Sequence, residues 1–302
     1  MTLKKHAYLI IAHNEFDILK SLIEVLDDER NDIYIHIDLK SKLSEKEQRK
    51  FTVNKSSIYF INRTSINWGG YSQIQCEIEL LKAATKKTYS YYHLLSGVDF
   101  PLKNQNEIHN FFEKNQGKEF VHFDRKSIQK STLNRIEFYY FLQDNVFFSK
   151  NKWTGFIRRK INSLIIYIQK KIKINRLISN DITYMKGANW FSITNEFATY
   201  VVSKENWISK TFRNTLCADE MFLQTLLYNS KFKNNLYFKK LNNDYLSIMR
   251  YIDWEKGNPY TWRAEDFNIL KESPYLFARK FSSRIDSKII DDLKNYLLSN
   301  DE

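Results

Sequence analysis

The chain has 302 residues, of which 43% are hydrophobic and 16% aromatic, and its formal net charge is +12. This composition excludes a disordered chain, and the low numbers of glycine (seven) and proline (three) exclude collagen-like and low-complexity chains. Two cysteines, Cys76 and Cys217, are too few for a secreted disulfide framework, and no Cys/His cluster indicates zinc. The charge leaves nucleic acid, anionic lipid and an anionic substrate open as partners.

The first part of the chain alternates predicted strands with predicted helices. Such alternation predicts an α/β fold with a mostly parallel central sheet flanked by helices. Ligands bind outside the carboxyl ends of the strands in sheets of this kind. Asn14, Asp38, Trp68 and Asp99 all follow predicted strands, so we expect them at that edge. The predicted strands are 7–13, 32–38, 57–62, 89–95 and 119–124, and the predicted helices are 17–26, 72–86 and 107–113.

The middle of the chain, 126–180, is basic and aromatic instead. Within it, 155–173 places apolar residues at helical spacing opposite a charged face, which predicts an amphipathic helix. Packing of this helix on the protein's own core is the favoured interpretation, and binding to a protein or membrane surface is the alternative. No stretch approaches the roughly 20 apolar residues of a membrane span.

The pair Asp219-Glu220 stands at the front of a predicted helix that carries Phe222 and Leu226 on one side. The positive end of the helix dipole favours an ionised carboxylate at this position. A fixed, ionised carboxylate can serve as a general base. The structural alternative is an ordinary acid in the first turn of a helix.

Five segments carry a family resemblance by their order along the chain. They are WGG at 68–70, LSGVDFPLK at 95–103, YMKGANWFSIT at 184–194, CADEMFLQT at 217–225 and LFARKF at 276–281. In this order they resemble the core-2/I-branching β-1,6-N-acetylglucosaminyltransferases and the protein xylosyltransferases. The resemblance runs from about residue 7 to about residue 281.

The resemblance implies a single domain, 1–302, with a GT-A-like nucleotide-sugar-binding fold. Its nucleotide-binding half would be about 1–124, and its acceptor and catalytic half 125–302. The implied activity is inverting transfer from a UDP-sugar, with UDP-N-acetylglucosamine favoured over UDP-xylose. Animal members are Golgi enzymes with an N-terminal anchor and several disulfides. This chain therefore resembles a bacterial-type member, which we expect in the cytoplasm or at the inner face of the membrane.

The resemblance also assigns residues. Glu220 matches the family's catalytic base, and Asp219 beside it would fix the loop and border the acceptor. Asp38 would contact the uridine end of the donor, and Trp68 could cover the uracil ring. Asp99 would touch the donor sugar or organise its loop. The structural alternatives are turn residues for the two isolated aspartates and a core side chain for the tryptophan.

We expect no metal and no cofactor beyond the donor. The sequence contains no Asp-x-Asp triplet, and the resembling branching enzymes work without metal. The leaving diphosphate then needs cationic side chains. Lys280 matches the family's phosphate-binding lysine, whereas Arg279 beside it could face the structure. The family's upstream arginine is missing at Tyr260, and Arg263 and Arg250 are the candidate replacements.

Arg135 and Trp190 are candidate acceptor residues, because a guanidinium can clamp sugar hydroxyls and an indole can stack on a pyranose. The expected acceptor is a glycan or a lipid-linked glycan, with peripheral membrane contact as an option. A basic nucleic-acid-binding protein is a rival class, but no RNA-recognition or helix-turn-helix signature is present, so we expect no nucleic acid. A non-catalytic glycan-binding relative is a second rival, and the presence of Glu220 and Lys280 argues against it.

Overall fold

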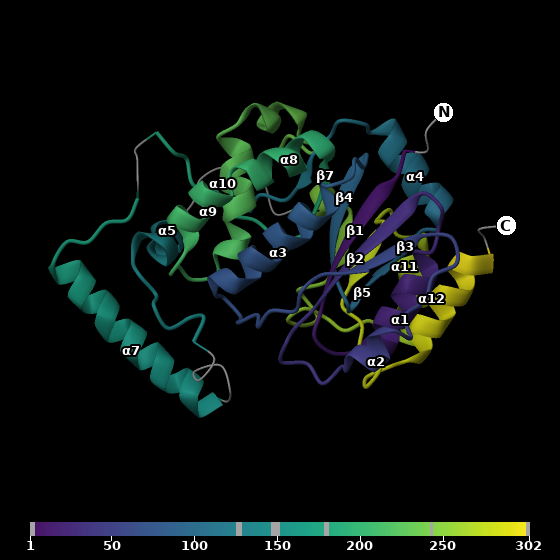
Figure 1. Cartoon of the computed structure of the whole chain (residues 1–302), viewed down its shortest axis with the longest axis horizontal. Coiled ribbons are helices and arrows are strands. Elements are labelled where there is room, and N and C mark those ends of the chain that lie inside the picture. The colour runs from purple at the N-terminus through teal and green to yellow at the C-terminus, as the bar shows by residue number, and fades with distance from the viewer. Residues whose placement is uncertain (1–3, 125–128, 146–151, 178–180, 242–243, 300–302) are drawn as a thin grey trace.

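A six-stranded sheet forms the centre of the computed structural model, which describes residues 4–124, 129–145, 152–177, 181–241 and 244–299 (Figure 1). The strand order is β3-β2-β1-β4-β7-β6, and β7 runs antiparallel to both of its neighbours. The four strands from β3 to β4 pair in parallel. The predicted α/β class with a mostly parallel sheet is therefore confirmed. The strands are β1 (His6–Ala12), β2 (Asn31–Ile37), β3 (Ser57–Phe60), β4 (Tyr91–Ser96), β6 (Phe120–Val121) and β7 (Phe191–Thr194).

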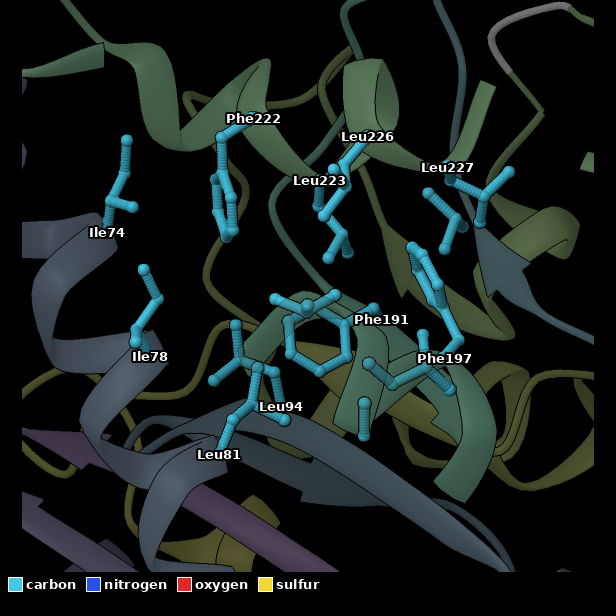
Figure 2. Packing of buried hydrophobic residues seen from close by; sticks show 14 of the residues in the cluster. Ile74, Ile78, Leu81, Leu94, Phe191, Phe197, Phe222, Leu223, Leu226 and Leu227 are labelled. Atoms are coloured by element: carbon cyan, nitrogen blue, oxygen red, sulfur yellow. The ribbon is translucent and has the colours of Figure 1, made fainter. Parts of the chain in front are cut away.

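Helices cover both faces of this sheet because β1, β2 and β4 are almost fully buried and present apolar residues on each side. On one face, α3 (Tyr71–Ala84), α8 (Asn195–Ser203), α9 (Glu205–Phe212) and α10 (Phe222–Tyr228) bury a shared core. Figure 2 shows Ile78 of α3 and Phe222 of α10 in this core, together with Leu94 of β4. The opposite face carries α1 (Phe16–Val25), α4 (Gln105–Lys114), α11 (Phe267–Glu272) and α12 (Lys288–Ser299).

A second, three-stranded sheet ties the C-terminal part of the chain to the end of β4. Its order is β5-β9-β8, with bounds β5 (Asp99–Pro101), β8 (Arg250–Ile252) and β9 (Phe277–Arg279). The pairing of β5 with β9 brings the segment LFARKF beside the loop that contains Asp99. The remaining helices are α2 (Glu45–Gln48), α5 (Lys130–Glu137) and α7 (Lys152–Lys171), and the 3-10 turns are η1 (Ala218–Glu220), η2 (Lys231–Asn235), η3 (Tyr245–Ile248) and η4 (Ala264–Asp266).

Two predicted elements differ in the structure. Glu220 lies in η1, one short turn before α10, so it does not occupy the first turn of the α-helix. The predicted amphipathic helix is present as α7, but its apolar residues do not pack on the protein's own core. Among the helices of the described ranges, none is long and apolar enough to cross a membrane.

Candidate functional site

A cavity of about 920 Å³ lies at the carboxyl ends of β1, β2 and β4. This is the edge at which open α/β sheets bind ligands, and the volume suits a small-molecule ligand. Strand ends, the start of α3, the segment before β7, and α7 all contribute to its wall. The lining residues are Ile11, His13, Asp38, Lys40, Ser41, Ile66, Trp68, Gln73, Glu77, Ser96, Gly155, Arg158, Arg159, Asn189, Trp190 and Arg279.

Asp38 lies in the cavity wall, directly after β2, as predicted. Its backbone N–H donates to the carbonyl of Ala12 at 2.9 Å, which holds the loop against β1. Its Oδ1 accepts from the backbone N–H of Lys40 at 2.8 Å, and its Oδ2 lies 3.8 Å from the Lys40 ammonium. Arg63 donates to the carbonyl oxygens of Asp38 and Ser41 and so fixes the rest of the loop. The carboxylate is thereby oriented while an oxygen keeps capacity to accept a further bond.

Trp68 also lines the cavity and is 74% exposed, so its indole does not belong to the core. The next residue, Gly69, has a φ of +73°, and a Cβ there would lie 2.9 Å from Cys217 Sγ. Only glycine fits such a backbone without strain. The tight turn lets the carbonyl of Gly69 accept from the backbone N–H of Cys217 at 2.9 Å, which joins the WGG segment to the loop of Asp219 and Glu220.

Asp99 does not face the cavity, which corrects its prediction as a donor-binding residue. It is 2% exposed, and both carboxylate oxygens are occupied. Oδ2 accepts from the backbone N–H of Ser96 at 2.7 Å, and Oδ1 accepts from the Ser96 hydroxyl and from Arg279 Nη1, each at 2.8 Å. A carboxylate bonded in this way organises its loop, which was the second option for this residue. What it orients is Arg279.

Arg279 is the cation that the LFARKF segment brings to the cavity. Asp99 fixes one side of its guanidinium, and the guanidinium carbon lies 4.4 Å from the centroid of the Trp190 ring. Both Arg279 and Trp190 line the cavity. An arginine that is stacked on an aromatic ring and paired on one edge loses little freedom when it binds an anion with its remaining N–H groups.

Arg250 is wrong as a candidate phosphate ligand. It is 2% exposed in the core, where its guanidinium donates to the carbonyl of Phe191 at 2.9 Å and to the Ser192 hydroxyl at 3.1 Å. Burial lowers its pKa to about 10. This arginine joins β7 to β8 and cannot reach a ligand in the cavity.

Lys280 and Arg263 do not line the cavity in the part of the chain that the structure describes. Lys280 is half-buried, and Arg263 is exposed on the turn of η4. Lys280 and Glu220 are therefore not brought together in the wall of this cavity. In this segment it is the neighbouring Arg279 that lines the cavity.

Glu220 is not among the described residues that line the cavity, and it lies between α5 and the segment before β7. Its Oε2 pairs with Arg135 Nη1 at 2.9 Å and with the Lys186 ammonium at 3.5 Å. Lys186 also binds Asp124 at 2.5 Å. The backbone N–H of Gly187 donates to the carbonyl of Glu220 at 2.9 Å, which fixes the turn. Arg135, predicted to contact the acceptor, is thus a partner of the predicted base.

Two buried acids, Asp219 and Glu77, lie in the region between Glu220 and the cavity wall. Asp219 is 7% exposed and accepts from Gln73 Nε2 at 3.3 Å, and Gln73 lines the cavity. Burial, with a smaller contribution from Glu220, raises the pKa of Asp219 to about 7. Glu77 also lines the cavity, and burial followed by repulsion from Asp219 raises the pKa of Glu77 well above its ordinary value. Within the described ranges, Asp219 Oδ1 and Glu77 Oε2 lack hydrogen-bond partners.

Sequence reasoning missed Glu77, although a signal exists. The side chain falls on the same face of α3 as Ile74, Ile78 and Leu81, which all pack in the core. A glutamate inside an apolar helical stripe is rarely buried without a partner or a function. That mismatch between residue and pattern could have marked it.

Replacing Asp219 with asparagine should make the protein's stability less dependent on pH. The folded protein holds the Asp219 proton up to a pKa of about 7, against an ordinary value of 3.8. Since the unfolded chain releases this proton earlier, the free energy of unfolding falls as pH rises through that window. Asn at position 219 has no proton to release, so this fall in the free energy of unfolding should be absent from the variant. As the pH rises through the window, Asp219→Asn should therefore become more stable relative to wild type, by up to a few kcal/mol at about 1.4 kcal/mol per pKa unit.

Urea unfolding at a series of pH values measures this difference. Glu77, Glu220 and Arg135 also influence the group, so the window can broaden. Glu272→Gln, which changes an exposed acid on α11, is the control and should show no such trend. A difference between Asp219→Asn and wild type that stays constant from pH 4 to pH 8 would contradict the assignment.

Comparison with known proteins decides the family. The model of the Core-2/I-Branching enzyme family matches residues 6–272. The chain belongs to this family. The resemblance that the five segments indicated is therefore confirmed.

Curated relatives of this Core-2/I-branching family member include three xylosyltransferases. Xylosyltransferase 2 of Rattus norvegicus is 25% identical over 310 residues, which are 96% of this chain and 33% of the relative. Xylosyltransferase sqv-6 of Caenorhabditis briggsae is 25% identical, over 88% of this chain and 33% of the relative. Xylosyltransferase 1 of Rattus norvegicus is 23% identical, over 97% and 35%. The chain spans about a third of the length of these relatives.

Among solved structures, the apo form of mouse xyloside xylosyltransferase 1 matches 91% of this chain and 96% of its own, with a TM-score of 0.37 and 11% identity. In the described residues of the family member studied here, no group of three or more His, Cys, Asp or Glu side chains is arranged to hold a metal ion.

Proposed function

We propose that this protein is an inverting glycosyltransferase that moves a sugar from a UDP-sugar to a hydroxyl of a glycan. The observation that carries the proposal is the cavity itself. In a member of the Core-2/I-branching family, it joins an oriented carboxylate, an exposed indole and a fixed guanidinium at the carboxyl ends of the central strands. Membership and the xylosyltransferase relatives support a sugar-transferring enzyme.

Three side chains suit the parts of a UDP-sugar. Asp38 can accept a hydrogen bond from the uracil N–H or a ribose hydroxyl. Trp68 presents an exposed ring on which the base can stack. Arg279 offers N–H groups to the diphosphate, where a planar guanidinium binds two oxygens at once. The donor sugar is N-acetylglucosamine in the favoured form of the proposal and xylose in the alternative.

Glu220 is the proposed base of a single displacement. Arg135 and Lys186 both approach Oε2, so Oε1 is without a partner among the described residues and is available for a proton. The carboxylate accepts the proton of the acceptor hydroxyl while that oxygen attacks the anomeric carbon from the side opposite UDP. The bond to the diphosphate breaks, its electrons stay on UDP, and Arg279 stabilises the new charge. An α-linked donor then gives a β-linked product.

Trp190 is the proposed acceptor platform, since it lines the cavity and carries Arg279 on one ring face. Arg135 acts on the acceptor only through Glu220. Asp219 holds the loop of Glu220 in place, since it is buried and accepts a hydrogen bond from Gln73. The acceptor is a glycan, either free or linked to a lipid.

Ligand-induced shifts of the melting temperature test the proposal. A ligand that binds only the folded protein raises this temperature. We expect a rise with UDP, UDP-N-acetylglucosamine or UDP-xylose, and no comparable rise with ADP- or GDP-sugars. No rise with any uridine ligand, together with a rise on adding single-stranded RNA, would favour the nucleic-acid-binding class instead.

Transfer should survive an excess of EDTA. No Asp-x-Asp triplet is present in the sequence, and Asp99 is bonded to Ser96 and Arg279. A divalent cation prefers several oxygen ligands that are free to coordinate it. UDP release in the presence of EDTA, against release with added Mg²⁺ or Mn²⁺, measures this. Loss of activity on chelation, with recovery on adding either ion, would contradict a metal-independent reaction.

A further inference from the structure

The helix α7 packs on the rest of the protein through its polar side. Its buried residues are Gly155, Asn162 and Gln169, which recur every seven positions and share one face. Gln169 accepts from the backbone N–H of Tyr139 at 2.8 Å and donates to the carbonyl of Tyr139 at 3.0 Å. Asn162 donates to Gln143 at 3.4 Å. An amphipathic helix of a globular protein normally turns its apolar stripe inward, so α7 is inverted.

Six of the nine large apolar side chains of α7 are exposed, whereas Ile157, Ile165 and Ile166 are half-buried. Trp153 is 74% exposed and Leu164 is 60% exposed, although both are large and apolar. At about 100° per residue, the exposed apolar side chains all fall on the side opposite the buried residues. Figure 1 shows α7 at the outer edge of the molecule, away from the central sheet. The outer face is defined by Trp153, Phe156, Ile161, Leu164, Tyr167 and Ile168.

Charge distinguishes among the possible occupants of this face. Residues 153–171 include Arg158, Arg159, Lys160, Lys170 and Lys171 and no acidic residue. Lys160 and Lys171 lie among the apolar side chains of the outer face, with their ammonium groups 5.5 Å from the Phe156 ring and 5.6 Å from the Tyr167 ring. A second copy of the helix would bring like charges together, which disfavours self-pairing. A complementary partner offers apolar groups to the exposed side chains of this face and negative charge to its lysines.

We propose that the outer face of α7 binds the surface of an anionic lipid bilayer. Trp, Tyr and branched apolar side chains with interspersed lysines are the composition that lies in the headgroup region of a bilayer. The long stems of Lys160 and Lys171 can lie along the acyl boundary while their ammonium groups meet lipid phosphates. The helix lies flat on the bilayer, since it is too polar to cross it.

The same helix forms part of the proposed active site. Gly155, Arg158 and Arg159 line the cavity from the inner side of α7. A bilayer under the outer face would therefore lie close to the mouth of the cavity. This suits an acceptor whose sugar is attached to a lipid, and this last step rests on the proposed function, whereas the lipid binding does not.

Flotation with vesicles tests the lipid contact. The full chain should float with vesicles of phosphatidylcholine and phosphatidylglycerol, and bind vesicles of phosphatidylcholine alone at least about tenfold more weakly, since each basic residue near an anionic surface adds to the attraction. Salt at about 0.5 M should weaken binding, because the Debye length is then only a few ångströms. Leu164→Ser/Ile168→Ser and Lys160→Glu/Lys171→Glu should each lower binding by about tenfold or more.

Ile269→Ser/Leu298→Ser is the matched control, because these apolar residues are similarly exposed on α11 and α12. It should bind vesicles as wild type does, and an unchanged melting temperature shows that each variant is folded. Equal binding to neutral and anionic vesicles, or unchanged binding in both α7 variants, would overturn the proposal. A dimer that Leu164→Ser/Ile168→Ser converts to a monomer, without vesicle binding, would also overturn it in favour of a second copy.

The lipid-binding proposal and the transferase proposal can be tested independently of each other. Loss of vesicle binding in a protein that still releases UDP from a UDP-sugar removes only the lipid contact. Vesicle binding by a protein that recognises no uridine ligand removes only the transferase.

Discussion

Glu220→Gln is expected to reduce turnover by a hundredfold or more while UDP binds with nearly normal affinity. Glutamine keeps the shape of the side chain but cannot accept the acceptor's proton, and positioned proton transfer contributes about 10²–10⁴ to a rate. Arg135 and Lys186 approach from one side, and neither lines the cavity in which the donor is proposed to bind. Donor binding should therefore be insensitive to the substitution.

Turnover and UDP affinity must be measured on the same preparations. Calorimetric titration with UDP gives the affinity, and release of UDP during the reaction gives the rate. Glu272→Gln, an exposed acid changed in the same way, should behave as wild type. Unchanged turnover in Glu220→Gln would remove Glu220 from the mechanism.

Arg279→Ala is expected to weaken UDP binding by roughly ten- to a hundredfold and to slow transfer further. A hydrogen bond to a charged group contributes about 1.5–3 kcal/mol, and the diphosphate acquires more charge as it leaves. Arg279→Lys should recover part of the loss, because the charge returns without the two-pronged geometry. Titration with UDP, followed by rate measurements at saturating donor, separates the two effects.

The substitution also leaves Asp99 without its ion pair, so folding must be checked. Arg279→Ala/Asp99→Asn removes the unpaired buried charge and should restore the melting temperature but not UDP affinity. Lys280→Ala and Arg263→Ala should have smaller effects, because neither residue lines the cavity. If Lys280→Ala weakens UDP binding strongly and Arg279→Ala does not, the phosphate contact belongs to Lys280.

The sheet could be predicted from the sequence because its signals are local. Ile33, Ile35 and Ile37 alternate with polar residues along β2, and the strand ends at Asp38, which lies in the cavity as expected. Trp68 and Trp190, the candidate donor and acceptor residues, also line the cavity. For Asp38, the position directly after a strand determines which edge of the sheet the side chain occupies.

The sequence alone could not show which of the basic residues lies in the cavity. Arg250 is buried because β8 pairs with β9 and lies against β7, and these contacts join residues far apart in the sequence. Asp99 bonds to Ser96 three residues away, which is a local pattern, but its pairing with Arg279 spans 180 positions. The choice between Arg279 and Lys280 depends on that pairing.

The choice of the buried face of α7 also could not be predicted from the sequence. Periodicity predicts the helix and its two faces, and it favours burial of the apolar one. The polar face is buried instead, since Asn162 and Gln169 find partners on the segment around Tyr139 and Gln143. Glu77 shows the reverse case, in which a polar residue on an apolar face stays beside the core and borders the cavity.

UDP release from UDP-N-acetylglucosamine and UDP-xylose, by wild type and by Glu220→Gln, tests the central claim most directly. Even without an added acceptor, slow donor hydrolysis by water needs the same cavity and the same base. We predict measurable release from at least one of the two donors by the wild-type protein, reduced a hundredfold or more in Glu220→Gln. No release from either donor by a folded wild-type protein, or equal release by the variant, would contradict the account.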